Sequence, residues 1–144
     1  MKLTFKLMLI LLVASYGCSK DESLSKHDQM VKNLAATWGN AKVMHATDGD
    51  LSSQYTGFAL TFAKSAGSGM DGIFVVENGG HAFPDASGQW SLSSDLTKIE
   101  TSTGNNWEFT LKDNAMTLEF DIPEAGGRIQ GLTGRVVFEL TKAK

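Results

Sequence analysis

From Ala35 to the C-terminus, apolar and polar residues alternate in short runs, and this pattern constrains the fold more than any other feature of the chain. Successive side chains of a β-strand point to opposite faces, so an alternating run buries one face and exposes the other. An antiparallel sheet with one buried side has this pattern. Three runs show it most clearly: Trp107-Phe109-Leu111, Leu118-Phe120-Ile122 and Val136-Phe138-Leu140.

The pattern predicts eight strands with no helix-length segment between them, which argues against parallel βαβ units. Residues that tolerate the positive φ of tight turns separate the runs. We expect turns at Asp48-Gly49, Asn78-Gly79, Gly104-Asn105, Asp113-Asn114 and Gly126-Gly127. We expect strands at Ala35 to Ala46, Gly57 to Ala63, Gly72 to Glu77, Gly88 to Ser93, Lys98 to Thr101, Asn106 to Leu111, Met116 to Ile122 and Arg135 to Thr141.

Eight strands linked by hairpins predict an all-β fold, an eight-stranded antiparallel up-and-down barrel. Closure of the barrel removes exposed strand edges, which would otherwise promote aggregation. The interior of such a barrel is filled by its own side chains or holds one small ligand. A sandwich of two sheets is the alternative, because the number of strands does not distinguish the two.

One short helix is expected before the strands, in the segment SKHDQMVKNLAATW. Ser25 is suited to cap it, and Asp28 would lie in its first turn, where a negative charge is favourable. Met30, Val31 and Leu34 would form its apolar stripe. The alternative is that this segment continues a polar tether.

The N-terminus has the layout of a secretory signal peptide. Lys2 and Lys6 precede a short apolar run that is followed by small residues, and the run is too short to cross a bilayer. We therefore divide the chain into a signal peptide at 1–17, a lipidated tether at 18–26 and a β-barrel domain at 27–144. Loss of the leader would change the net charge from −3 to −5, since two lysines leave with it.

Cys18 is the only cysteine of the chain, so it has no internal disulfide partner. The segment ASYGC resembles the lipobox of bacterial lipoproteins, which implies that the thiol of Cys18 carries a diacylglycerol and that the new N-terminus is acylated, for example with palmitate. The following CSKDES resembles the export signal of Bacteroidetes-type surface lipoproteins. The two resemblances imply a protein anchored by lipid in the outer membrane and exposed at the cell surface. An ordinary polar tether is the alternative reading of CSKDES.

The strand region resembles the small lipocalin-like lipoproteins of Bacteroidetes through LAATWGNAKV, FALTFAKSAG, SGQWSLSSD and GRVVFELTK, in this order. Trp38 matches the tryptophan of the family's first strand, although Ala36 replaces the family's glycine, and a literal Gly-x-Trp stands at Gly88 and Trp90. The resemblance implies a cup-shaped barrel without a cofactor. It also implies that a basic residue packs on Trp38, and both Arg128 and Arg135 fit that role.

Signals of catalysis or of metal binding are weak. His27, His45 and His81 share no ligand spacing, and Asp48 and Asp50 lack the spacing of a calcium loop. No nucleophile motif is present, and the acidic balance argues against nucleic acid. We therefore expect no enzyme activity, no catalytic residue, no cofactor and no metal site.

The aromatic residues are the remaining candidates for a binding site. They either line a ligand cavity, which is mainly apolar in most proteins, or fill the barrel as its core. Two functions follow: a barrel that binds a small apolar or amphipathic ligand, or a solid-packed accessory subunit of a cell-envelope complex. The candidate ligand-binding residues are Trp38, Phe62, Trp90, Trp107, Phe109, Phe120 and Phe138.

Overall fold

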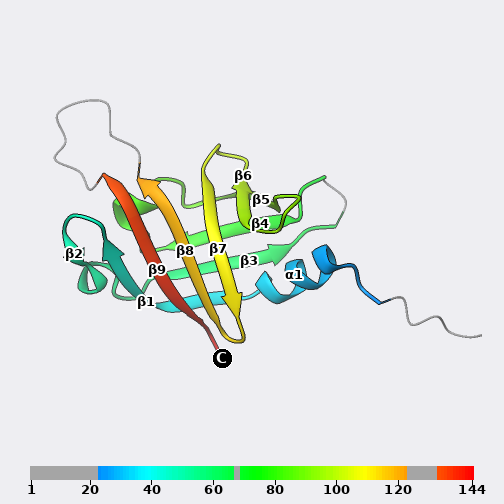
Figure 1. Cartoon of the computed structure of the whole chain (residues 1–144), viewed down its shortest axis with the longest axis horizontal. Coiled ribbons are helices and arrows are strands. Elements are labelled where there is room, and N and C mark those ends of the chain that lie inside the picture. Colours follow the sequence, from blue (N-terminus) through cyan, green and yellow to red (C-terminus); the bar gives the residue numbers. More distant parts are fainter. Residues whose placement is uncertain (1–22, 67–68, 123–132) are drawn as a thin grey trace, which may run out of the picture.

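The computed structural model describes residues 23–66, 69–122 and 133–144 of the 144-residue chain. These residues form one α-helix, nine strands and two short 3₁₀ helices (Figure 1). The α-helix and strands are α1 (Lys26–Leu34), β1 (Thr37–His45), β2 (Gly49–Asp50), β3 (Ala59–Lys64), β4 (Gly72–Glu77), β5 (Ser87–Leu92), β6 (Lys98–Thr101), β7 (Asn106–Lys112), β8 (Ala115–Ile122) and β9 (Gly134–Lys142). The 3₁₀ helices are η1 (Ser52–Tyr55) and η2 (Gly80–Ala82).

The strands close into a barrel. β1 and then β3 to β9 pair in sequence order, all antiparallel, and β9 pairs back with β1. The two-residue β2 pairs with β1 beside this ring. The all-β, eight-stranded up-and-down barrel with a short helix is thus confirmed, and the sheet does not split into a sandwich.

The predicted strand bounds differ from the observed ones mainly at the ends. Two of the eight match. The largest differences are at the first two: β1 runs from Thr37 to His45 rather than from Ala35 to Ala46, and β3 from Ala59 to Lys64 rather than from Gly57 to Ala63. β2 was not predicted. α1 begins at Lys26, which is the last residue of the predicted tether.

The expected turns connect the strands in different ways. Asp113-Asn114 forms a two-residue hairpin between β7 and β8, with Asp113 at φ 54°. Asn78 adopts the expected positive φ, 53°, but the expected tight hairpin is wrong, because a longer connection containing η2 follows β4. This connection buries Phe83 in the barrel, which a tight turn would not allow. Gly126-Gly127 lies outside the described residues.

Two glycines make room for aromatic rings on neighbouring strands. Gly88 of β5 stands opposite Phe74 of β4, and Gly72 of β4 stands opposite Trp90 of β5. A Cβ atom at Gly88 would lie 2.7 Å from the ring of Phe74. The Gly-x-Trp at Gly88 and Trp90 therefore serves the packing of β4 against β5.

Helix α1 packs beside β3, and the first tryptophan joins it to the barrel. The Ser25 side chain accepts a hydrogen bond of 3.0 Å from the backbone N–H of Asp28, as expected of a helix N-cap. Val31 and Leu34 are buried. The indole N–H of Trp38 donates to the Leu34 carbonyl at 3.0 Å, which satisfies a carbonyl that the helix end leaves without a partner.

Among the described residues, Lys142 lies over Trp38, with its Nζ 5.8 Å from the ring centroid. The expectation of Arg135 in this role is wrong, because that side chain lies over carboxylates on neighbouring strands. Antiparallel pairing of β1 with β9 places Lys142 directly opposite Trp38 and explains the choice. Arg128 lies outside the described residues.

Candidate functional site

The seven aromatic residues predicted to line a ligand cavity are all buried, with exposed fractions of 7% or less. Several of their rings contact one another. The ring centroid of Phe62 lies 5.2 Å from that of Trp90 and 6.4 Å from that of Trp107, and the stacked rings of Phe120 and Phe138 have centroids 5.8 Å apart. Such pairs stabilise a core beyond the burial of their area. These side chains therefore belong to the packed core of the barrel.

Phe83 completes this packing from an unexpected position. It follows η2, outside any strand, and is 5% exposed. Its ring centroid lies 5.1 to 5.4 Å from those of Phe58, Trp107, Phe120 and Phe138. Around Phe83, the interior of the barrel is therefore occupied by the protein's own side chains.

A pocket opens where β7 and β8 stop pairing. Their ladder ends at Glu108 opposite Glu119, although β8 continues to Ile122 with β9 as its partner. Trp107 and Phe120, one residue further on, are therefore not paired with each other. The pocket at this place has a volume of about 300 Å³. Its lining residues are Ala82, Phe83, Pro84, Asp85, Lys98, Gly104, Asn105, Asn106, Trp107, Glu108, Glu119, Phe120, Asp121 and Arg135.

The pocket thus has three aromatic residues and a charged rim. Of the seven predicted aromatics, it brings together Trp107 and Phe120, and Phe83 joins them. The turn before β7 is held to the segment after η2, because the Asn105 side-chain amide donates to Asp85 at 3.2 Å. This hydrogen bond fixes two parts of the pocket wall that are far apart in the sequence.

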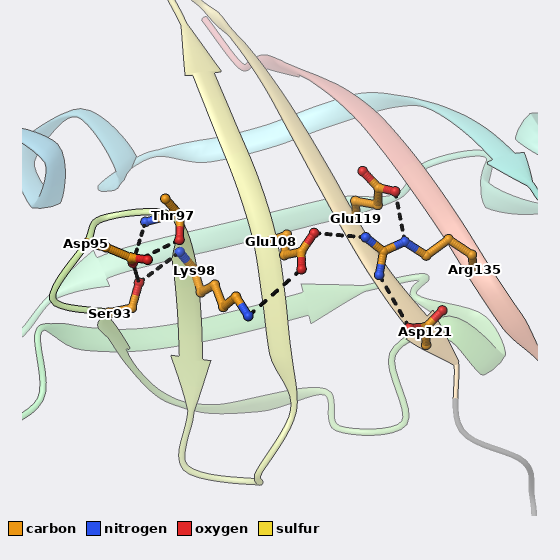
Figure 2. Close-up of polar contacts among 8 residues, drawn as sticks. All are labelled: Ser93, Asp95, Thr97, Lys98, Glu108, Glu119, Asp121 and Arg135. Carbon is orange, nitrogen blue, oxygen red and sulfur yellow. Dashed lines mark hydrogen bonds and ion pairs between the residues drawn. The ribbon is translucent and has the colours of Figure 1, made fainter.

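Arg135 organises the charged rim (Figure 2). Its side chain extends from β9 over β8, where Nε donates to Glu119 and Nη2 to Glu108, both at 2.8 Å. Nη1 donates to Asp121 at 3.3 Å. The hydrogen bonds to Glu119 and, less strongly, to Glu108 raise the pKa of Arg135 further above its usual range. Lys98 adds a looser ion pair with Glu108, at 3.9 Å.

The strand register explains why an arginine stands here. The two-residue turn between β7 and β8 places Glu108 directly opposite Glu119. Like charges at such a position are destabilising, and the guanidinium of Arg135 lies where it offsets both. The four carboxylates and two cations that line the pocket leave it with a net charge of −2 at neutral pH.

Hydrogen bonds to Asp95 hold the turn that leads into β6. Asp95 accepts hydrogen bonds from the side chains of Ser93 and Thr97 and from the Thr97 backbone (Figure 2). These bonds, that from Ser93 first, lower the pKa of Asp95 to about 2. The turn thereby holds the start of β6, and with it Lys98, beside the pocket.

The histidines lie elsewhere. His27 contacts Asp71 at 3.1 Å, and His45 is buried against the Thr133 carbonyl and Asp48. His81 is exposed, and no histidine is among the residues that line the pocket. Within residues 23–66, 69–122 and 133–144, no group of His, Cys, Asp and Glu side chains is arranged to hold a metal ion.

Sequence reasoning missed most of the rim. The alternating pattern places Glu119 and Asp121 on the solvated face of their strand, Asn105 was expected only in a turn, and Phe83 and Asp85 were not considered. A signal was present, because a two-residue turn at Asp113-Asn114 pairs Glu108 with Glu119, and a nearby cation would offset the repulsion between these two carboxylates.

Comparisons with known proteins leave the chain without an identified family, since no family model, curated protein or solved structure matches it. In the part of the chain that the structure describes, no helix is long and apolar enough to cross a membrane. Cys18 lies outside the described residues.

Proposed function

We propose that this protein is a lipocalin-like lipoprotein, anchored through Cys18 in the outer membrane and exposed at the cell surface, whose barrel binds a small amphipathic ligand without transforming it. The observation that carries the binding function is the pocket of about 300 Å³ between β7 and β8, which borders a core packed with aromatic and aliphatic side chains. Its volume is at the lower end of the range of small-molecule sites.

The lining supports an amphipathic ligand rather than a wholly apolar one. Phe83, Trp107 and Phe120 offer apolar contact, whereas the rim offers carboxylates, amides and two cations. A volume of about 300 Å³ suits a short chain or a single ring with a polar head. A long acyl chain would require displacement of Phe83.

The arrangement of charges supports binding rather than catalysis. Arg135 holds the three nearest carboxylates in ion pairs, so these groups have a structural partner and a fixed position. The proposed anchor would keep the site near the bilayer, because the eight residues from Cys18 to Ser25 span at most about 28 Å when fully extended.

Calorimetric titration of the mature chain tests the binding function. The ligands are octyl glucoside, octyl sulfate and octyltrimethylammonium, each below its micellar concentration. We expect at least one to bind, and binding to be lost in Asn106→Trp, where the new ring would fill the pocket. Thr110→Trp, on the same face of β7 but outside the pocket lining, is the matched control. Absence of binding by all three ligands would refute the proposal.

The anchor needs its own test. We expect mass spectrometry of the membrane fraction to find a diacylglycerol on Cys18, and Cys18→Ser to release the protein from the membrane. Protease treatment of intact cells should remove a tag from the anchored protein. An unmodified thiol, or a tag protected from protease, would contradict the proposed localisation.

A second function, as an accessory subunit of a cell-envelope complex, is favoured by a different observation. Ile73 and Val75 on the outer face of β4 are 48% and 42% exposed, and the barrel interior behind them is filled. Their cross-strand neighbours carry no charge: Thr61, Ala63, Ser87 and Gln89. Crosslinking in membranes through a cysteine at position 75 would capture a partner if this function is correct, and would yield only the monomer if it is not.

A further inference from the structure

The charges around the pocket indicate which head group a ligand would carry, an inference that rests on the proposed binding function. An anionic head group needs a cation with donors to offer. Arg135 already shares its charge among three carboxylates through Nε, Nη1 and Nη2, which leaves it one further N–H on each Nη, and Lys98 lies 3.9 Å from Glu108. Among the described lining residues no other cation faces the pocket. A ligand carboxylate or sulfate would therefore have to share these two cations with carboxylates that already outnumber them.

The carboxylates are in the opposite situation. Glu119 and Asp121 each bind Arg135 through one oxygen, and in the described part of the chain their second oxygens have no hydrogen-bond donor. Asp85 likewise uses one oxygen, on Asn105. The side chain of Asp121 is 67% exposed and is accessible from solvent. These oxygens can accept hydrogen bonds from an incoming primary amine, and they can attract a quaternary ammonium through charge alone.

We infer that the pocket selects compact amphiphiles with a cationic amine or ammonium head, held by Asp121 and its neighbouring carboxylates, and that it disfavours amphiphiles with an anionic head. The apolar part of the ligand lies against Trp107, Phe120 and Phe83. The net charge of −2 at the rim acts in the same direction, because opposite charge attracts the ligand at the mouth of the pocket. The attraction between exposed charges is weakened by salt.

The experiment compares three octyl ligands on the mature chain: octyltrimethylammonium, octyl sulfate and octyl glucoside. Binding is followed by calorimetry at low and at physiological ionic strength. We expect octyltrimethylammonium to bind at least tenfold more tightly than octyl sulfate at low salt, with octyl glucoside between them. The ratio should fall as salt increases.

Two variants separate a local effect from the overall charge of the protein. Asp121→Asn removes a carboxylate from the pocket rim, and Asp113→Asn removes an exposed carboxylate from the turn of the same hairpin, outside the pocket. Both change the net charge equally, and asparagine tolerates the positive φ of position 113. We expect Asp121→Asn to lower the affinity for octyltrimethylammonium at least threefold and Asp113→Asn to leave this affinity unchanged.

The outcomes distinguish this inference from the function on which it rests. Octyl sulfate or octyl glucoside binding as tightly as octyltrimethylammonium, with loss in Asn106→Trp, would overturn the charge selection while the pocket remains a binding site. Equal effects of Asp121→Asn and Asp113→Asn would also overturn it. If none of the three ligands binds, the proposed function fails as well.

Discussion

Replacement of Phe83 by alanine tests whether the barrel is filled by its own side chains. The ring is 5% exposed and has four aromatic neighbours within 5.4 Å. Loss of its burial alone costs about 1.5–3 kcal/mol, and with the cavity left behind we expect a decrease of about 3–5 kcal/mol in the free energy of unfolding. For a domain of this size the melting temperature would fall by roughly 10–20 °C.

Urea denaturation of residues 18–144, followed by circular dichroism, measures this loss. Ile73→Ala on the exposed face of β4 is the control, with an expected change within about 0.5 kcal/mol. The cavity would join the pocket, so Phe83→Ala should also bind dodecyl ligands more tightly than the wild type does. If Phe83→Ala does not fold, Phe83→Leu replaces it, with a smaller loss. A decrease below about 1 kcal/mol for Phe83→Ala would show that the ring does not fill the interior.

Three further predictions concern the framework. Gly88→Ala should lower the free energy of unfolding by about 1–3 kcal/mol in urea, because its Cβ would meet the ring opposite on β4, and an unchanged value would contradict this packing. Lys142→Met should cost about 0.5–1 kcal/mol and alter the fluorescence of Trp38, and unchanged stability would argue against the cation–π contact. Asp95 should titrate by NMR at about 2, and Ser93→Ala should raise this pKa toward the ordinary 3.8; an equal value in both would refute the role of the hydroxyl. Since the folded pKa is lowered, the stability that this turn contributes is present above about pH 4 and is lost as pH falls toward 2.

The barrel could be predicted because its determinants are local. The period of two sets which side chains enter the core, and turns such as Asp113-Asn114 set the register of adjacent strands. The position of Lys142 could not be predicted in this way. It depends on the pairing of β1 with β9, two strands that lie about a hundred residues apart in the sequence. The register of this pairing also shifts between Gly39 and Lys42.

The pocket was hidden for a similar reason. It exists because the β7–β8 ladder stops before either strand ends, and no residue pattern marks the last pair. Phe83 lies in a connection without periodicity, so nothing in the sequence assigns its ring to the interior. The aromatic residues were identified correctly as a group, but the sequence did not show which of them border open space.

The pairing of β1 with β9 has a consequence for how the protein folds. Every other strand pair of the ring joins neighbours in the sequence and can form as soon as its hairpin is complete, whereas this pair closes a loop of about a hundred residues and must wait for the last strand. A chain that crosses a membrane from its N-terminus would therefore hold an open sheet with two unpaired edges until Gly134–Lys142 arrives. During that interval it is most exposed to aggregation and to proteases.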